Sequence, residues 1–322
     1  MKVYALIPAA AMLWCGVAVE AQAPAAAESK PFAAGGPLGA KNQAGEFVPL
    51  SSNVKVFGSF GFAESVTYDA DRNLIVVMNA GTPPKDGKPA DNDGYVSLLN
   101  PDGSVHTAKW IGATRDGLTL NDPLGSCIQN GLLYAADIDV VRTFDMKTGA
   151  PGRVYPVEGA TFLNGIAVAK DGTIFVSNTK PASIVYKITP SGEVSKFVDG
   201  KPLDLPNGVA IDTEGNVVVV NVSATDNNVL TFDPASGKLL KTEQAVEAGN
   251  DGIVVLADGT KYVSSVRYGS VSEIKPGQKA KIIASGIPSA ASMGYDSKQN
   301  QLLIPMNPNN SVAFIKLGEA AK

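Results

Sequence analysis

The chain has few of the residues that most often serve as catalytic nucleophiles and bases. Its 322 residues include one histidine, His106, and two cysteines, Cys15 and Cys127. No Gly-x-Ser-x-Gly motif is present, and a Ser-His-Asp triad would have to use His106. That residue lies in SVHTAKWI, which we expect to be an outer, surface strand. A serine hydrolase mechanism is therefore disfavoured.

The first 23 residues have the pattern of a secretory signal peptide. Met1 and Lys2 precede an uncharged run from Val3 to Val19, and small residues follow. The run is too short and too poorly flanked for a membrane span. We therefore expect export to the periplasm or secretion, and after cleavage Cys127 alone remains, which excludes an internal disulfide.

The net charge limits the classes of binding partner, and the composition indicates how the chain is organised. The formal net charge is −4, so nothing indicates binding to nucleic acid or to an anionic membrane surface. Residues 24–52 are rich in Ala, Gly and Pro without periodicity, and we predict a flexible segment there. The oligomeric state is left open. Residues 53–322 are predicted to form a single domain.

That domain is built on a repeat. The clearest copy is PNGVAIDTEGNVVVVNVS, from Pro206 to Ser223, and further copies align Asn207 with Glu64, Asp122, Asn164, Asp251 and Ala291. They recur at intervals of roughly 40–60 residues, which is typical of propeller blades, and the 3.6-residue periodicity of helical repeats is absent. The sequence predicts an all-β protein, a six-bladed β-propeller.

Each unit holds four strand signals. In the fourth unit these are residues 208–212, 216–221, 229–232 and 239–242, separated by the turn sequences DTEG and DPASG. The sixth unit has only three. We expect Asn53–Phe57 to supply its outer strand, so that an N-terminal strand closes the last blade and removes the exposed sheet edges.

The aligned position just before each inner strand lies at the mouth of the predicted central channel. Five of its six residues carry side-chain oxygens: Glu64, Asp122, Asn164, Asn207 and Asp251, with Ala291 as the exception. Converging carboxylates repel one another unless a cation lies between them. Oxygen ligands without His or Cys favour Ca²⁺, then Mg²⁺ or Mn²⁺, with Zn²⁺ last.

A second set of polar residues ends the second strand of each unit at the same face. It consists of Asn79, Asp137, Asn178, Asn221, Ser265 and Asn307. Such residues either bind substrate or only cap turns, and both roles stay open here. As candidate substrate-binding residues we select Asn164, Asp122, Asn178 and Asn221, together with Phe162 ahead of the third repeat.

These features resemble the gluconolactonase and regucalcin family of six-bladed propellers. The likeness rests on the blade count, Pro206-Asn207-Gly208, Asp251-Gly252 followed by Asp258-Gly259, and Glu64 ahead of a strand. It covers roughly residues 53–317. The resemblance implies a divalent ion, commonly Ca²⁺, held by Glu64, Asn207 and Asp251, with Asn164 near metal and substrate and Asp251 as candidate base.

Two positions depart from the family pattern. Glu64-Ser65-Val66 stands where Glu-Gly-Pro is common, which changes a turn. Phe162 stands where sugar-lactone members tend to carry an arginine, so a less polar lactone or ester is expected. Two long connections, residues 82–93 and 114–120, emerge at the same face, either as a lid or as surface loops.

The predicted function is metal-dependent hydrolysis of a small lactone or ester. The ion would polarise the carbonyl while Asp251 or Glu64 takes a proton from water. Two alternatives stay open. One is an exported, non-enzymatic binding or scaffold propeller with a structural metal, and the other is a phosphotriesterase that uses the same ion.

Overall fold

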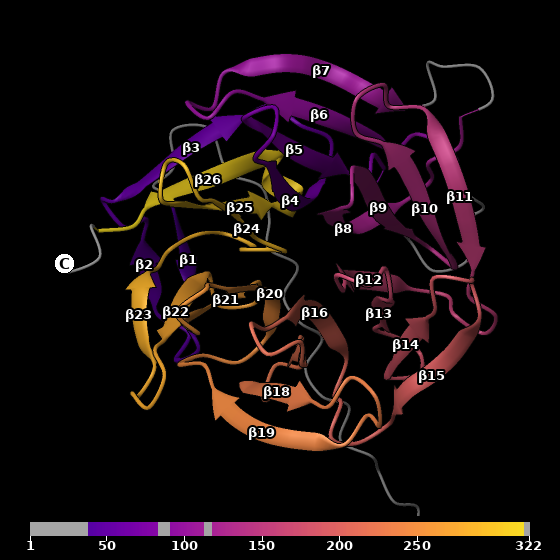
Figure 1. The fold of residues 1–322 in the computed structure, drawn as a ribbon. Helices are drawn as coiled ribbons and strands as arrows, with labels where there is room; N and C mark the ends of the chain where they lie inside the picture. Colours follow the sequence, from indigo (N-terminus) through magenta and orange to yellow (C-terminus); the bar gives the residue numbers. More distant parts are fainter. Residues whose placement is uncertain (1–37, 83–90, 113–117, 319–322) are drawn as a thin grey trace, which may run out of the picture.

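The computed structural model describes residues 38–82, 91–112 and 118–318. Six four-stranded antiparallel sheets stand around a central axis, as Figure 1 shows. The predicted six-bladed β-propeller is confirmed. Signal peptide residues 1–23 lie outside the described residues, so export stays a prediction.

The blades follow one another along the chain, each from its inner to its outer strand. Blade 1 contains β4 (Ala63–Asp69), β5 (Leu74–Asn79), β6 (Tyr95–Leu99) and β7 (Val105–Gly112). Blade 2 contains β8 (Pro123–Gln129), β9 (Leu132–Asp137), β10 (Val140–Asp145) and β11 (Pro151–Pro156). Blade 3 contains β12 (Leu163–Val168), β13 (Ile174–Asn178), β14 (Ile184–Ile188) and β15 (Val194–Asp199).

The other three blades complete the ring. Blade 4 contains β16 (Pro206–Ile211), β17 (Val217–Asn221), β18 (Asn228–Phe232) and β19 (Leu239–Gln244). Blade 5 contains β20 (Asn250–Val255), β21 (Lys261–Ser265), β22 (Ser270–Ile274) and β23 (Lys281–Ala284). Blade 6 contains β24 (Gly294–Asp296), β25 (Gln301–Met306), β26 (Ser311–Lys316) and β3 (Val54–Gly58), with the 3₁₀ turn η1 (Asn307–Asn309) between β25 and β26.

Blade 6 joins the two ends of the domain. Strand β3 pairs with β26 from Ser311↔Gly58 to Ile315↔Val54. The predicted N-terminal closing strand is therefore confirmed. Because the outer edge of this sheet comes from the start of the domain, the ring is closed by backbone hydrogen bonds between its first and last segments.

Tight turns join the two innermost strands of blades 3, 4 and 5. Gly172, Gly215 and Gly259 have φ values of 90°, 87° and 81°, which favour glycine. In each turn an aspartate that precedes the glycine accepts a backbone hydrogen bond. In blade 5, Asp258 Oδ1 accepts from Thr260 N at 2.9 Å. These DG and EG turns fix the register of the inner hairpins.

The hydrophobic core lies between the blades. Six clusters of described residues each join two neighbouring blades. Along β5, Val76 and Met78 pack toward blade 2, while Ile75 and Val77 pack toward blade 6. Side chains alternate faces with period two, so a strand between two blades is apolar on both faces.

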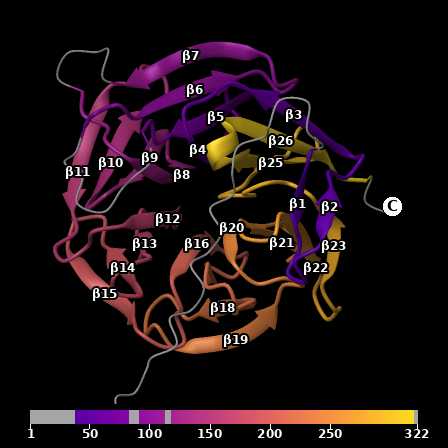
Figure 2. The ribbon, with the colours of Figure 1, turned by 180° about the vertical axis from the view of Figure 1, so that it is seen from behind.

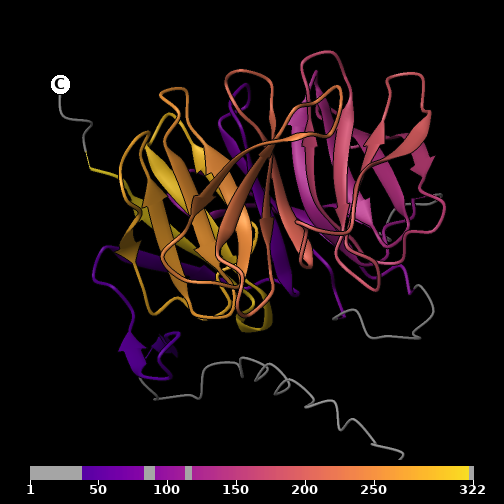
Figure 3. The same ribbon diagram turned by 90° about the horizontal axis from the view of Figure 1, so that it is seen from below.

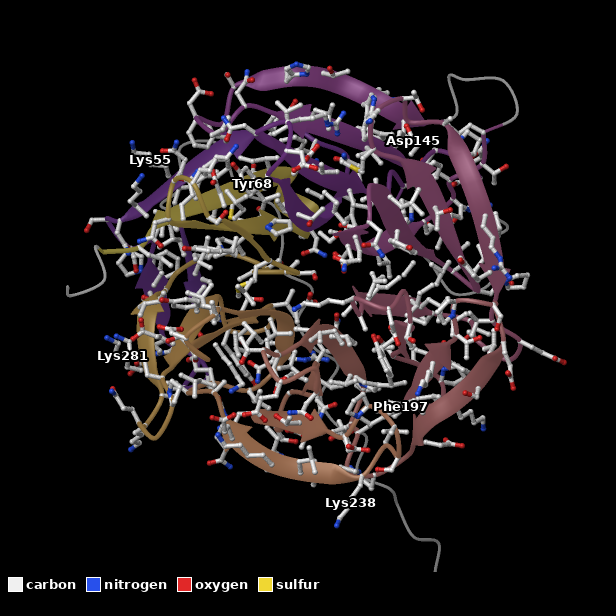
Figure 4. All side chains as sticks on the ribbon, viewed as in Figure 1. Lys55, Tyr68, Asp145, Phe197, Lys238 and Lys281 are labelled. Carbon is white, nitrogen blue, oxygen red and sulfur yellow. The ribbon has the colours of Figure 1, made fainter. Side chains whose placement is uncertain are left out.

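Figure 4 shows the rim of the ring. Lys55, Lys238 and Lys281 lie on its outer side and point away from the molecule, whereas Phe197 lies at the blade 3 and 4 packing. The Phe197 ring centroid is 4.9 Å from that of Phe175 and 6.3 Å from that of Phe232. Positive charge at the rim is therefore separated from the central axis.

Glycines let the inner strands pack closely around that axis. A Cβ on Gly165 would come within 2.0 Å of Asn207 O, and one on Gly208 within 2.4 Å of Asp251 O. A side chain there would clash with the backbone of the next blade. A cavity of about 270 Å³ runs between the inner strands and is lined by residues of all six blades.

Part of the segment expected to be flexible is folded. Strands β1 (Gly39–Lys41) and β2 (Phe47–Pro49) form a hairpin that Figure 2 shows over blade 5 and Figure 3 shows projecting from one side of the ring. Gln43 N donates to Glu247 Oε1 at 3.1 Å, and Ala248 N donates to Gln43 Oε1 at 3.1 Å. These contacts with the loop before β20 stabilise two strands too short to be recognised from sequence.

Candidate functional site

A β-bulge lies near the start of the inner strand in five of the six blades. In blade 3 the pairing is Leu163↔Asn178 and then Ile166↔Val176, so one extra residue lies in β12. Blades 1, 2, 4 and 5 have the same irregularity in β4, β8, β16 and β20. A bulge turns side chains out of the regular alternation, which is how strands often aim residues at a site.

Four polar residues occupy this bulge: Glu64, Asn164, Asn207 and Asp251. Each is 3–4% exposed. Asn207 Nδ2 donates to Asp251 Oδ2 at 3.1 Å, which links blades 4 and 5. We call these four residues the inner ring.

Asn307, at the start of η1, joins the inner ring from blade 6. Its Nδ2 donates to Glu64 Oε2, and its side chain is 8% exposed. The sequence placed Asn307 only among the residues at the ends of second strands. Its contact with Glu64 depends on the 3₁₀ turn after β25, which no sequence pattern indicated.

The inner ring has buried oxygens that lack hydrogen-bond donors. Among the described residues, Asn164 Oδ1, Asn207 Oδ1, Asp251 Oδ1 and Asn307 Oδ1 accept no hydrogen bond. A buried acceptor without a partner costs roughly 1–3 kcal/mol, and native proteins rarely keep several together. A cation among these oxygens would satisfy them.

Burial also raises the pKa values of the two inner-ring carboxyl groups, Glu64 and Asp251. Burial, followed by the negative charge of Asp251, raises the pKa of Glu64 well above its ordinary value. Burial raises the pKa of Asp251 from 3.8 to about 7, although the hydrogen bond from Asn207 and the positive charge of Arg267 lower it. Both ionised forms are costly here without a positive charge between them.

The inner ring fits a hard divalent cation. Two carboxylates match a 2+ charge, and the amide and carboxylate oxygens are the ligands that Ca²⁺ prefers. Throughout the described ranges, no group of three or more His, Cys, Asp or Glu residues could hold a metal, so any ion here would depend on amide oxygens. This donor set is unlike the Cys and His sites of zinc.

The residues that end the second strands have a different role. Asn178 is fully buried, and its Oδ1 accepts from Thr161 N and Phe162 N, both at 3.0 Å. Its Nδ2 donates to Lys180 O at 3.2 Å and to Ala182 O at 2.8 Å. All the usual hydrogen-bonding capacity of this amide is used inside the protein.

Asn221 and Asn79 hold their blades in the same way. Asn221 Oδ1 accepts from Asp204 N at 3.1 Å, and its Nδ2 donates to Asp226 Oδ2 at 3.1 Å. Asn79 Oδ1 accepts from Gly61 N at 3.1 Å. These hydrogen bonds show the capping role that the sequence left open for Asn178 and Asn221, and their predicted contact with substrate stays a prediction. We call Asn79, Asp137, Asn178, Asn221 and Ser265 the outer ring.

Asp122 is not at the inner-ring position of blade 2. Pro123 pairs with Asp137 as Pro206 pairs with Asn221, so the residue equivalent to Asn207 is Leu124. A Cβ on Gly125 would meet Asn164 O, just as one on Gly165 would meet Asn207 O. The predicted alignment was therefore wrong by two residues in this blade.

Asp122 lies before the strand, where its backbone N donates to Asp137 Oδ1 at 2.9 Å. Leu124 is buried. Ala291 keeps its predicted position, because Gly252 packs against Ala291 O as Gly208 packs against Asp251 O. At this aligned strand position blades 2 and 6 thus have apolar side chains, Leu124 and Ala291, where the other four blades have polar ones; the polar contribution of blade 6 is Asn307, which comes from η1.

Phe162 lies two residues before Asn164 and is partly exposed. The ammonium group of Lys180 lies 4.7 Å from the centroid of its ring, a distance suited to cation–π attraction. This position therefore carries positive charge beside an apolar surface.

The two long connections fall mostly on residues 83–90 and 113–117, outside the described residues. At the base of the first, Thr82 N donates to Asp93 Oδ2 at 2.8 Å. Their proposed role as a lid stays a prediction.

Neither the single histidine nor the single described cysteine belongs to the inner ring. His106 is exposed on the outer strand β7, as predicted. Cys127 lies on β8, and burial raises the pKa of its thiol to about 11. A thiol that stays protonated at neutral pH is a poor nucleophile.

Arg267 is a site residue that the sequence did not indicate. It lies between β21 and β22, and its Nε donates to Val222 O at 2.5 Å. Its positive charge lowers the pKa of Asp251. The only sequence signal was its place shortly after Ser265, at the end of a second strand.

Fold and site together define a six-bladed β-propeller with a buried ring of polar side chains near the starts of its inner strands. No family model matches the chain. Structures of the same fold include a structural-genomics target assigned as a gluconolactonase by family, with 16% identity over 87% of this chain and 97% of that one and a TM-score of 0.62. The gluconolactonase of Xanthomonas campestris has 17% identity over 83% and 91% of the chains and a TM-score of 0.61.

Virginiamycin B lyase of Staphylococcus aureus also shares the fold, with 13% identity over 82% of this chain and all of that one and a TM-score of 0.54. Among curated proteins, actin-interacting protein 1 of Caenorhabditis elegans is 26% identical over 196 residues, 57% of this chain. The matched region spans only 30% of that protein's length. The predicted likeness to gluconolactonase propellers is confirmed at the level of fold. In the described part of the chain, no helix is long and apolar enough to cross a membrane.

Proposed function

We propose that this protein is a metal-dependent hydrolase of lactones or related esters, acting at the mouth of the propeller channel. The observation that carries the proposal is the inner ring, whose two carboxylates and two amides are buried. Within the described residues, Asp251, Asn164 and Asn207 each keep one side-chain oxygen without a hydrogen-bond donor. Gluconolactonases with the same fold support the substrate class. The small-molecule substrate and the ion are both part of the proposal.

The ion would be held by Glu64, Asn164, Asn207 and Asp251. Asn307, which donates a hydrogen bond to Glu64, places one more amide oxygen beside it. Ca²⁺ is the first choice, followed by Mg²⁺ or Mn²⁺ and then Zn²⁺. A bound divalent cation supplies positive charge that polarises the ester carbonyl and compensates the charge developing on its oxygen.

Asp251 is the better candidate for the proton acceptor. Asn207 orients its Oδ2, while its Oδ1 has no donor among the described residues. Glu64 already accepts a hydrogen bond from Asn307 at Oε2. Asp251 would take a proton from water as the water oxygen bonds to the carbonyl carbon, and the alcohol oxygen would take that proton as its bond to the carbon breaks.

Purified protein should be tested on a panel of small lactones and aryl esters as prepared, after EDTA, and after Ca²⁺ is restored, with the Tm followed in parallel. We expect turnover that disappears with EDTA and returns with Ca²⁺. A paraoxon-type phosphotriester belongs in the panel, because preference for it would move the protein to the phosphotriesterase class. A metal-dependent rise in Tm with no turnover on any substrate would show a binding or scaffold propeller instead.

A further inference from the structure

We propose that Arg267 selects substrates with a carboxylate group, so that the protein acts on anionic lactones or esters. This inference rests on the proposed function for its reaction, but its binding component can be tested separately. Three features carry it: how the side chain is held, which of its donors are left over, and the charge of the mouth around it.

The side chain of Arg267 is held between two blades. Gly249, two residues before Asp251, has a φ of 69°, and a Cβ there would lie 2.6 Å from both Cγ and Cδ of Arg267. Glycine therefore makes room for the arginine stem over the entrance to β20. The Nε bond to Val222 O fixes the other end of the stem to blade 4.

The same loop is fixed by its next residue. Tyr268 OH donates to Ala224 O at 2.9 Å, and Tyr268 N donates to Ser265 Oγ at 3.1 Å. The loop after β21 is thus hydrogen-bonded to the loop after β17. A guanidinium anchored in this way loses little further entropy when it binds a ligand.

The two Nη groups remain available. Within the described ranges they donate no hydrogen bond, and Arg267 forms no ion pair within 4 Å. The residue is partly exposed, so these donors reach solvent at the mouth. A planar fork with free donors matches the two oxygens of a carboxylate.

Charge at the mouth points to the same ligand. The charges of Glu64 and Asp251 would be balanced by a divalent ion, so these two carboxylates would not neutralise Arg267, whose positive charge acts on Asp251. Lys180 adds a second positive charge at the Phe162 ring. The substitution of phenylalanine at position 162, which suggested a less polar substrate, is therefore offset by positive charge from other residues.

The test compares a carboxylate-bearing lactone with the carboxamide of the same lactone. In Arg267→Met we expect kcat/KM for the carboxylate to fall about 10- to 100-fold, the loss typical of a charged hydrogen bond, and that for the carboxamide to change less than about 3-fold. Arg267→Lys should recover part of the loss. Lys238→Met, at the outer rim in Figure 4, is the matched control and should change neither substrate.

Equal losses on both substrates, or no preference for the carboxylate in the unmodified protein, would overturn the inference. A binding measurement separates it from the reaction. Calorimetry with the carboxylate of a tetrahydropyran, which has no ester to hydrolyse, should show binding that Arg267→Met abolishes and Lys238→Met retains. If that binding is found but no lactone turns over, the proposed reaction fails and the anion site stands; if the unmodified protein does not bind it, the anion site is refuted.

Discussion

The inner and outer rings use similar residue types at the same face of the propeller, yet their hydrogen bonding is opposite. Asn178 of the outer ring makes four hydrogen bonds inside the protein. Asn207 of the inner ring makes one, and its Oδ1 has no donor among the described residues. A buried polar residue therefore indicates a binding site when its oxygens are unpaired, and a structural role when they are hydrogen-bonded.

Replacing an inner-ring carboxylate should produce the largest effect. Asp251→Asn should lower kcat by about 10²- to 10⁴-fold, because the proton acceptor is lost, while the far-ultraviolet spectrum stays that of the folded protein. Asp258→Asn is the matched control, since it lies in the turn at the other end of the same strand. A variant that keeps its turnover would remove Asp251 from the reaction.

Replacing an outer-ring residue should reverse that pattern. Asn178→Ala removes four buried hydrogen bonds and leaves Thr161 N and Phe162 N without acceptors. We expect the free energy of unfolding in urea to fall by about 3 kcal/mol. The Ca²⁺ affinity of the folded variant should be unchanged. A large loss of affinity with unaltered stability would show that the two rings do not divide their roles in this way.

The stability of the metal-free protein should depend on pH through the inner ring, because Asp251 has a raised pKa. In metal-free protein the folded pKa of Asp251 is about 7, above its ordinary 3.8. The folded state therefore binds the proton more tightly, so its contribution to stability is complete below pH 4 and is lost as the pH rises through 7. We expect Tm to fall by on the order of 5 °C across this range, and Asp251→Asn to remove that part of the decline. A Tm that rises over this interval for Asp251-containing protein alone would contradict the assignment.

The smallest effect should come from Asp122. Because Leu124 occupies the ring position of blade 2, Asp122→Ala should change Ca²⁺ affinity less than about 2-fold, whereas Asn164→Ala should weaken it by roughly 10-fold or more. Titration with Ca²⁺ followed by calorimetry checks both variants. Equal losses would restore Asp122 to the inner ring.

The repeat made most of the fold predictable. The six copies of the repeat, the turn sequences between their strands and the missing strand of the sixth unit are all local signals, and together they specified six blades and their closure. Asn164, Asn207 and Asp251 could be aligned correctly because each is followed directly by a glycine, which marks the register of its strand. In blade 2 the alignment followed Asp122 instead of Gly125, and a shift of two residues keeps the face of a strand while moving its end.

Other features depend on contacts between distant segments. The β1–β2 hairpin is stabilised by hydrogen bonds between Gln43 and residues Glu247 and Ala248, about 200 residues away. Its strands of three residues are too short to show a periodic pattern in the sequence. Asn307 reaches Glu64 only through η1. Arg267 enters the site because Gly249 leaves space for its stem, and that relation is invisible until the loops of blades 4 and 5 are side by side.

The closing of blade 6 by β3 has a consequence for how the protein is made. Asn307 and Glu64 are separated by 243 residues, and β3 cannot pair with β26 until residue 316 has been synthesised. Both contacts require the chain to bring its two ends together, a step whose entropic cost grows with loop length and which slows folding. The proposed cation site would thus be completed only after translation has reached the last strand, and its occupancy would then report a finished ring.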